Sequence, residues 1–555
     1  MPGVREVADS YIEQMAACDP ISATSWGVPG YEDRLPDLSP DGLEKTADLE
    51  RAALEALAAS TQETDLDRVA AEVMSERLRA MLELHEAGDD LRSLRVLFSP
   101  HSSVRQVFDL MRLESESDWE VAATRLRAVP TALEQFRATL QEGLSRTLVS
   151  ARRQVLACAE QCDTWGGSQD AGASFFAGLV RRYPGGPVKD ELDSAARAAS
   201  LAYLELGAWL RKEYLPGAAA SDPVGRERYA RAARYFTGAA QLDLEDTYAF
   251  GWAELARIEE RMAAVCHEIA PGKSLPEVID DLESDPEHVI EGVDGFLRWN
   301  QELIDKTIAA LDGVHFDIAE PIRRCQAMIA PPGGAAAMYY TGPSEDFSRP
   351  GRTWYPTLGK TRFPLWREVS ICFHEAVPGH HLQIARVRYL ADRLNRFQRL
   401  TGFTSGHGEG WALYAERLMG ELGYLDDPAF ELGMLSAQAM RAVRVIVDIG
   451  MHLELAIPDQ ERYHPGERWT PELALAFVIE RSCFPADFMA SEVDRYLGLP
   501  GQAISYKVGE RVWLESRDAA KSRKGAQFDL KGFHGYALDL GGMGLDQLSR
   551  ELSRY

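Results

Sequence analysis

Helical periodicity is the feature that most limits the fold of this chain. Stretches rich in Ala, Leu, Glu and Arg recur along its 555 residues, with apolar residues three and four positions apart, the spacing that gives a helix one apolar face. Long strand-like runs are almost absent. The sequence therefore predicts a mainly α protein with helical stretches at 46–60, 64–88, 117–160, 188–214, 243–270, 290–312, 367–395, 407–422, 428–456, 470–482 and 502–524.

One segment departs from this helical texture. Residues 330–365 are rich in glycine, proline and aromatic residues, and their RTWYP piece is the best candidate for a short strand. Such a strand could pair with an extended peptide by strand addition. We expect a mainly helical N-terminal part, 1–325, and a part that carries the chemistry, 326–555. The two could equally form one continuous body.

Composition excludes several functions. The chain has 60 Lys and Arg against 86 Asp and Glu, a formal net charge of −26, which repels the phosphates of nucleic acid. The opening residues MPGVREVADSYIEQ lack the apolar core of a secretory signal, and no run of about 18 apolar residues could span a membrane. Seven scattered cysteines without a CxxC pair indicate reduced thiols. We therefore expect a cytoplasmic protein with no nucleic-acid or membrane partner.

Twelve histidines are spread over the chain, but they crowd near one place, His374-Glu-Ala-Val-Pro-Gly-His380-His381. Zinc peptidases commonly use HExxH, which places two imidazoles one helical turn apart with the glutamate beside the bound water. Here proline stands where the second histidine belongs. On a regular helix, His380 would be turned about 120° from His374, and His381 would lie roughly 10.5 Å along the axis. Neither could share a metal with His374 on such a helix.

The Pro378-Gly379 pair could interrupt the regular helix between His374 and His380. Proline removes an amide donor and glycine tolerates unusual backbone angles, so the pair can form a two-residue bulge. Without it the string becomes His-Glu-Ala-Val-His, which has the metal spacing. We predict a distorted helix with His374 and His380 as ligands and His381 as the alternative second ligand. A broken helix end with solvent-facing histidines would also fit the sequence.

A third ligand is offered about 30 residues downstream, in GHGEGWALYAE. Glu409 and Glu416 are seven residues apart and share one helical face. We predict that Glu409 binds the metal, and that Glu416 either orients a ligand imidazole through a hydrogen bond or is an alternative ligand. A solvated acidic face is the plain alternative. The GxGxG string at 406–410 is a weak nucleotide-loop match because no apolar strand precedes it.

Two further groups are candidates for the wall of a cleft. In one stretch Arg441, Asp448 and His452 fall near one helical face, with Arg444 beside it; this pattern also suits ion-paired scaffolding. Tyr506 follows a turn at a helix start, where its hydroxyl could stabilise an oxyanion, although a core tyrosine has the same pattern. The candidates for binding substrate are Arg441, Arg444, Lys507 and Tyr340, and Arg511 is a further candidate for holding a terminal carboxylate.

Three motifs in order, HEAVPGHHLQ, GEGWALYAE and PGQAISYKVG, together with DPISATSWGVPGYEDRLPDLS near the start, resemble a bacterial family of domains of unknown function, number eight hundred and eighty-five. The resemblance covers nearly the whole chain. It implies a zinc-metallopeptidase-like protein, similar to the mainly helical gluzincin peptidases with a deep central groove and a small β element before the metal-binding helix. The sequence departs from those peptidases in its two-residue expansion of HExxH.

These observations predict a zinc-dependent hydrolase of peptide or other amide bonds, with one Zn²⁺ per chain. Glu375 is the expected general base, and Tyr506, with His452 or Arg444, is expected to stabilise the oxyanion. Two alternatives remain open. One is a non-catalytic helical binding protein with a relic metal site, and the other is a metal-dependent tailoring enzyme that acts on a small amide.

Overall fold

The structure, a computed structural model, describes residues 2–168, 172–330 and 338–555. It forms two compact units: Met1–Pro223 with Leu497–Leu499, and Val224–Tyr496 with Pro500–Tyr555. The units therefore divide after Pro223, whereas the expected division at 325 and 326 separates helical sequence from the motif-bearing part. Helices make up 67% of the structure and strands 5%, which confirms the predicted mainly α fold.

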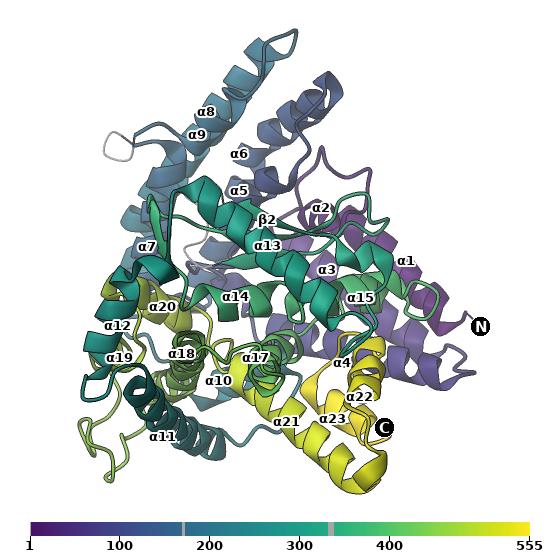
Figure 1. Cartoon of the computed structure of the whole chain (residues 1–555). Helices are drawn as coiled ribbons and strands as arrows, with labels where there is room; N and C mark the ends of the chain where they lie inside the picture. Colours follow the sequence, from purple (N-terminus) through teal and green to yellow (C-terminus); the bar gives the residue numbers. More distant parts are fainter. Residues whose placement is uncertain (1, 169–171, 331–337) are drawn as a thin grey trace. The chain divides into compact units, whose positions relative to one another are not determined.

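The first unit is helical throughout its described length (Figure 1). Its core is formed by the apolar faces of the longer helices, with Phe108, Leu126, Phe136, Cys158 and Tyr203 at most 1% exposed. Its helices are α1 (Val4–Cys18), α2 (Pro20–Trp26), α3 (Pro40–Ala58), α4 (Asp65–Glu86), α5 (Pro100–Leu110), α6 (Glu116–Ser145), α7 (Arg152–Gly166), α8 (Phe175–Val180) and α9 (Lys189–Trp209).

The single helical stretch predicted at 117–160 is two helices, α6 and α7. The chain turns between them at Thr147, which has a positive φ of 60° and therefore cannot continue a right-handed helix. The sequence around this turn has no proline, and its nearest glycine, Gly143, lies within the last turn of α6, so the periodicity gave no signal of the break.

The second unit contains the remaining helices. They are α10 (Gly225–Thr237), α11 (Leu244–Ile269), α12 (Leu275–Ser284), α13 (Val293–Leu311), α14 (Glu368–Glu375), α15 (His380–Tyr389), α16 (Arg396–Leu400), α17 (Ser405–Glu421), α18 (Pro428–Leu453), α19 (Pro471–Arg481), α20 (Ala486–Gly498), α21 (Ser505–Lys524), α22 (Leu530–Asp539) and α23 (Leu545–Leu552). Among the described residues, no helix has both the length and the apolar composition required to cross a bilayer.

Helix α18 lies at the centre of the second unit. Asp427 caps its N-terminus by accepting a hydrogen bond from Ala429 N, and Pro428 occupies the first turn, where a missing amide donor costs nothing. From Leu435 to His452 every side chain is buried, because α11 and α14 pack along it. A helix buried all round can hold polar side chains only where they find partners, which makes its arginines and its histidine informative.

Small β elements precede the candidate metal-binding helices, as predicted. Strand β1 (Val289–Glu291) pairs with β5 (Arg362–Pro364), and a second sheet has the order β2 (Cys325–Ile329), β4 (Gly351–Tyr355), β3 (Tyr339–Thr341). The RTWYP strand is β4, and it pairs parallel with β2 and antiparallel with β3. The expectation that it could bind a peptide by strand addition is therefore wrong, because both of its edges already carry a neighbouring strand.

Candidate metal centre

The histidine motif spans a break between two helices. Helix α14 ends at Glu375 and α15 begins at His380. Across the break, Gly379 N donates to Phe373 O at 3.0 Å, a bond over six residues where a regular helix spans four. Two residues have thus been inserted into the hydrogen-bond ladder. The expected bulge is present as a complete break, after which His380 is turned back toward His374.

Two residues hold this break in place. A Cβ atom at Gly379 would lie 1.9 Å from His374 O and 2.4 Å from Phe373 O, so only glycine permits so close an approach. From α17, Trp411 Nε1 donates to Pro378 O at 2.8 Å, and the Trp411 side chain is fully buried. The break therefore has a fixed geometry, because a hydrogen bond and a steric contact both define it.

Three potential ligands converge at the break. His374 Nε2 and His380 Nε2 each lie 3.4 Å from Glu409 Oε2. One ligand atom from each residue lies within 4.8 Å of the other two. The two imidazole rings are 4.8 Å apart and nearly perpendicular, and both histidines are buried. Two imidazoles and one carboxylate that meet at a common centre form a donor set suited to a divalent cation.

The other nitrogen of His374 is held by a carboxylate. His374 Nδ1 lies 2.7 Å from Glu416 Oε1, and Ser370 Oγ donates to the second Glu416 oxygen at 2.6 Å. Arg441 Nη2 approaches Glu416 Oε1 to 3.4 Å. Glu416 is thus surrounded by donors and directs Nε2 of His374 toward Glu409. Of the two roles that the sequence left open for Glu416, this is the geometry of the orienting role.

The electrostatics of the centre favour a bound positive charge. Burial disfavours the imidazolium of His374, but hydrogen bonds with Glu409 and Glu416 outweigh it and raise its pKa to about 9. Burial also opposes ionisation of Glu409, yet its bonds with His374 and His380 hold the pKa of Glu409 well below its usual range. The carboxylate is therefore ionised and the pocket attracts either protons or a metal cation.

His381 points away from this centre. Its Nε2 donates to Ile322 O at 2.6 Å, and its Nδ1 lies 2.9 Å from the hydroxyl of Tyr340. Burial lowers the pKa of His381 to about 4, so the imidazole is neutral; its one N–H is on Nε2, and Nδ1 accepts a hydrogen bond from the Tyr340 hydroxyl. Both ring nitrogens are therefore engaged, Nε2 with the Ile322 carbonyl and Nδ1 with Tyr340.

Glu409 is positioned by a close approach of two helices. At their crossing, a Cβ on Gly410 of α17 would lie 2.5 Å from Gly509 Cα, and a Cβ on Gly509 of α21 would lie 2.0 Å from Gly406 O. The glycines of GHGEG thus let the backbones of α17 and α21 touch. The GxGxG string is a helix-packing feature here, and α21 carries Tyr506 toward the centre.

Tyr506 lies beside the candidate ligands. Its ring stacks 6.4 Å from that of His374, and the guanidinium carbons of Arg444 and Arg441 lie 4.6 Å and 5.7 Å from its centroid. Burial, together with the negative charge of Glu409, raises the pKa of Tyr506. The hydroxyl therefore stays protonated at neutral pH and can donate a hydrogen bond.

Two predicted substrate-binding cations are already engaged with acidic partners. Arg444 donates to Glu492 Oε2 at 2.6 Å and to the Tyr496 hydroxyl at 3.0 Å. Lys507 is fully buried and donates to Glu510 Oε2 at 2.7 Å, to Glu254 Oε2 at 3.1 Å and to Gln438 Oε1. Lys507 has no donor left for a ligand, because an ammonium group has three.

Arg511 and His452 also have structural partners. Arg511 pairs with Glu515 and Asp246. His452, expected to act on the oxyanion, is fully buried with Nε2 3.1 Å from Tyr496 O, and burial lowers its pKa to about 4. It lies eleven residues from Arg441 along α18, roughly 16 Å. The structure therefore does not bring His452 to the ligands.

Glu375, the expected general base, is the last residue of α14 and directly follows the ligand His374. It is 8% exposed. Among the described residues, no side chain donates a hydrogen bond to its carboxylate, so its oxygens are available to a water molecule.

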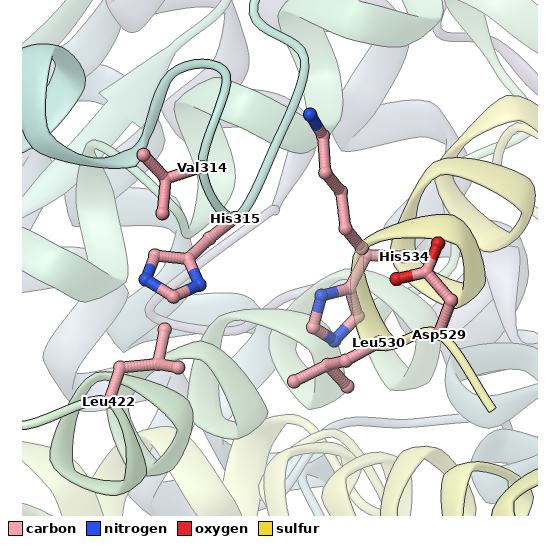
Figure 2. A pocket seen from close by; sticks show the side chains of 7 residues that line it. Val314, His315, Leu422, Asp529, Leu530 and His534 are labelled. Carbon is pink, nitrogen blue, oxygen red and sulfur yellow. The ribbon is translucent and has the colours of Figure 1, made fainter. Parts of the chain in front are cut away.

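The structure also contains a cavity of about 190 Å³ elsewhere in the second unit, lined by Val314, His315, Leu422, Asp529, Leu530, Lys531 and His534 (Figure 2). It contains none of the predicted site residues. Lys531 already binds Gly313 O and Asp317, and Asp529 caps α22. The predicted ligands meet at the histidine cluster instead.

Sequence reasoning missed two residues that shape the centre. Ser370 acts through its hydrogen bond to Glu416 and Trp411 through its hydrogen bonds to the carbonyls of Pro378 and Gly379, and neither residue type is a metal ligand. Ser370 lies four residues before His374, one helical turn away, which is the only signal that could have suggested it. Arg388, also missed, belongs to a separate group of arginines described below.

The fold and the centre define a class: a mainly α protein with a buried pair of histidines and a carboxylate brought together at a helix break. The chain belongs to the family described as bacterial protein of unknown function (DUF885), whose profile matches residues 20–552. This confirms the resemblance seen in the three motifs. The comparison with curated proteins returned no relative of this chain.

Two solved structures share the fold. One is titled "the putative lipoprotein from Colwellia psychrerythraea", with 20% identity, a TM-score of 0.83, and coverage of 100% of this chain and 99% of that chain. The other is "a putative lipoprotein of unknown function from Shewanella oneidensis", with 18% identity, a TM-score of 0.73, and coverage of 99% of both chains. This comparison contradicts the prediction of a cytoplasmic protein, because both structures are described as those of putative lipoproteins.

Proposed function

We propose that this protein is a zinc-dependent hydrolase of peptide or other amide bonds. The observation that carries the proposal is the convergence of His374 Nε2, His380 Nε2 and a Glu409 carboxylate oxygen within 4.8 Å of one another. The three residues come from α14, α15 and α17. They can meet only because the tertiary fold brings these three helices together.

The residues present fit a zinc ion. Two imidazoles and one carboxylate are the protein ligands of one class of catalytic zinc site, which leaves a fourth position open. His374 would bind through Nε2, since its Nδ1 is held 2.7 Å from Glu416. A carboxylate behind a ligand histidine fixes the tautomer and makes the imidazole more basic. We expect one ion per chain.

Zinc held by these residues would polarise the carbonyl of the substrate and lower the pKa of a bound water molecule. The chain supplies the proton transfers. Glu375 would accept the proton of the attacking water and pass it to the leaving amine. The protonated hydroxyl of Tyr506 would donate a hydrogen bond to the oxyanion that develops on the carbonyl oxygen. Arg441 would fix the position of the Glu416 carboxylate, which in turn orients the imidazole of His374.

The test combines metal analysis with hydrolysis. Purified protein should contain about one zinc per chain, and it should cleave at least some members of a set of dipeptides, longer peptides and acylated amino acids. Glu375→Gln should keep the zinc and lose hydrolysis by about 10²-fold or more. Glu302→Gln, an exposed site on α13, is the matched control and should change neither. Absence of zinc after zinc addition, or full activity of Glu375→Gln, would contradict the proposal.

A further inference from the structure

Arg388 is a buried arginine with two unsatisfied donor atoms. It lies in the last turn of α15 and is 8% exposed, and among the described residues its buried Nε and Nη1 atoms have no hydrogen-bond partner. Arg386, two residues earlier on the same helix, instead donates to Asp539 at 2.6 Å and to Asp317 O at 2.9 Å. A buried guanidinium with unsatisfied donors is costly, so an anionic ligand that accepts from them would be stabilised at this position.

The neighbourhood of Arg388 is positively charged. Glu345 is the acidic group that acts on it, but Glu345 Oε1 already lies 2.8 Å from Arg399 and 3.4 Å from Arg396. Burial lowers the pKa of Arg388 to about 10, and the positive charges of Arg399 and Arg349 add to this effect. One carboxylate therefore faces several guanidinium groups, and an additional anion would be attracted to them.

Helix α15 links this group to the candidate metal centre. Arg388 lies seven residues after His381 and so shares its helical face, the face on which the Tyr340 hydroxyl meets His381 Nδ1. The charge of Arg388 also acts on Tyr340. His380 stands eight residues before Arg388, a separation of roughly 12 Å along the helix. An extended chain covers this distance in about three or four residues.

We propose that Arg388 binds a carboxylate of the substrate, within the positive field of Arg349 and Arg399, at one end of a peptide-like ligand whose scissile bond lies at His374, His380 and Glu409. The inference rests on the proposed function. Arginine presents a planar fork that matches a carboxylate. Arg444 and Lys507, which the sequence suggested for this task, are committed to Glu492 and Glu510, whereas Arg388 Nε and Nη1 have no hydrogen-bond partner within the part of the chain that the structure describes.

Binding of two probes tests this subsite. N-acetyl-trialanine carries a free carboxylate, and its C-terminal amide is the neutral match. Calorimetry with the zinc-loaded protein should show the acid binding about tenfold or more tighter than the amide. Arg388→Met should remove this preference, and Arg388→Lys, which keeps the charge but loses the fork, should retain part of it. Arg393→Met is the charge-matched control, because Arg393 is 47% exposed and pairs with Asp539, and it should keep the preference.

Thermal stability gives an independent readout. Arg388→Met should melt no lower than the parent protein, because the substitution removes a buried charge with two unsatisfied donors. If Arg388 had only a structural role, its replacement would instead lower the Tm. A lowered Tm with an undiminished acid preference overturns the proposal, as does a parent protein with no preference. Binding of inorganic phosphate in place of either peptide also overturns it, in favour of a site for free anions.

The two proposals can fail separately. If the parent protein prefers the acid and Arg388→Met does not, but neither hydrolyses any amide, the subsite stands and the hydrolase proposal falls. If hydrolysis depends on Glu375 while Arg388→Met keeps the full acid preference, the hydrolase proposal stands and the subsite falls.

Discussion

The Nδ1 atom of His374 lies 2.7 Å from Oε1 of Glu416, two groups that are 42 residues apart in the chain. Glu416 is fully buried and also accepts a hydrogen bond from Ser370. Burial opposes its ionisation, but the charge of Arg441 and its bond with His374 lower the pKa of Glu416. The carboxylate therefore stays ionised and fixes which nitrogen of His374 faces the centre.

Replacing Glu416 by Gln should weaken zinc binding by about 10–100-fold, because the orienting charge behind His374 is lost. Competition with a chromogenic chelator measures this affinity. Glu302→Gln should leave the affinity unchanged. Unaltered zinc affinity in Glu416→Gln would show that the contact has no orienting role.

His380 and His381 should respond differently to removal. His380→Ala removes one of the three ligands and should lower zinc affinity by about a hundredfold or more. His381→Ala should keep the zinc, but should cost about 1–3 kcal/mol of stability because Tyr340 and the Ile322 carbonyl lose their partner. Metal analysis and chemical denaturation of the two variants measure both effects. Loss of zinc in His381→Ala alone would assign the ligand role to His381.

Gly379→Ala tests the helix break. The new Cβ would meet His374 O at 1.9 Å, so we expect a loss of about 1–3 kcal/mol in unfolding free energy together with weakened zinc binding. Gly535→Ala is the matched control. Its Cβ would meet no atom within 4 Å and it lies inside α22, where alanine should add about 0.5–1 kcal/mol. Equal effects in the two variants would contradict the steric argument.

Asp448 should make stability depend on pH. Burial raises its pKa to about 7, despite hydrogen bonds from Tyr229 and Gly501 that lower it. Because the pKa of Asp448 is higher in the folded state than in the unfolded state, the folded state binds the proton more tightly. The free energy of unfolding of the protein therefore falls as pH rises from about 4 to about 7. Asp448→Asn should remove that loss.

Denaturation at pH 5 and pH 8 checks this expectation. At pH 8 the Asp448→Asn variant should be more stable relative to the parent than at pH 5, by roughly 2–4 kcal/mol. The difference between variant and parent isolates Asp448, because the other titrating groups are common to both. A difference that does not change between the two pH values would mean that Asp448 keeps an ordinary pKa in the folded protein.

Local patterns predicted most of the helices and the residues of the centre. Apolar spacing located α4, α9, α11 and α18, because such a face must be buried wherever the helix packs. The seven-residue spacing of Glu409 and Glu416 placed them on one face of α17. Patterns of this kind fail for partners distant in the chain, and they assigned Lys507 and Arg444 to substrate although buried acids already hold both.

The sequence by itself determined the helical class, the family and an interruption of the regular helix at Pro378-Gly379, predicted as a bulge, since each depends on residues close together along the chain. Only the tertiary structure decided that His380 turns to the centre while His381 turns to Tyr340, that β4 has no open edge, and that two donors of Arg388 find no acceptor among the described residues. These features depend on which side chains from distant segments come into contact, and on which hydrogen-bond partner each one finds. The local pattern of residues along the chain does not specify such long-range contacts.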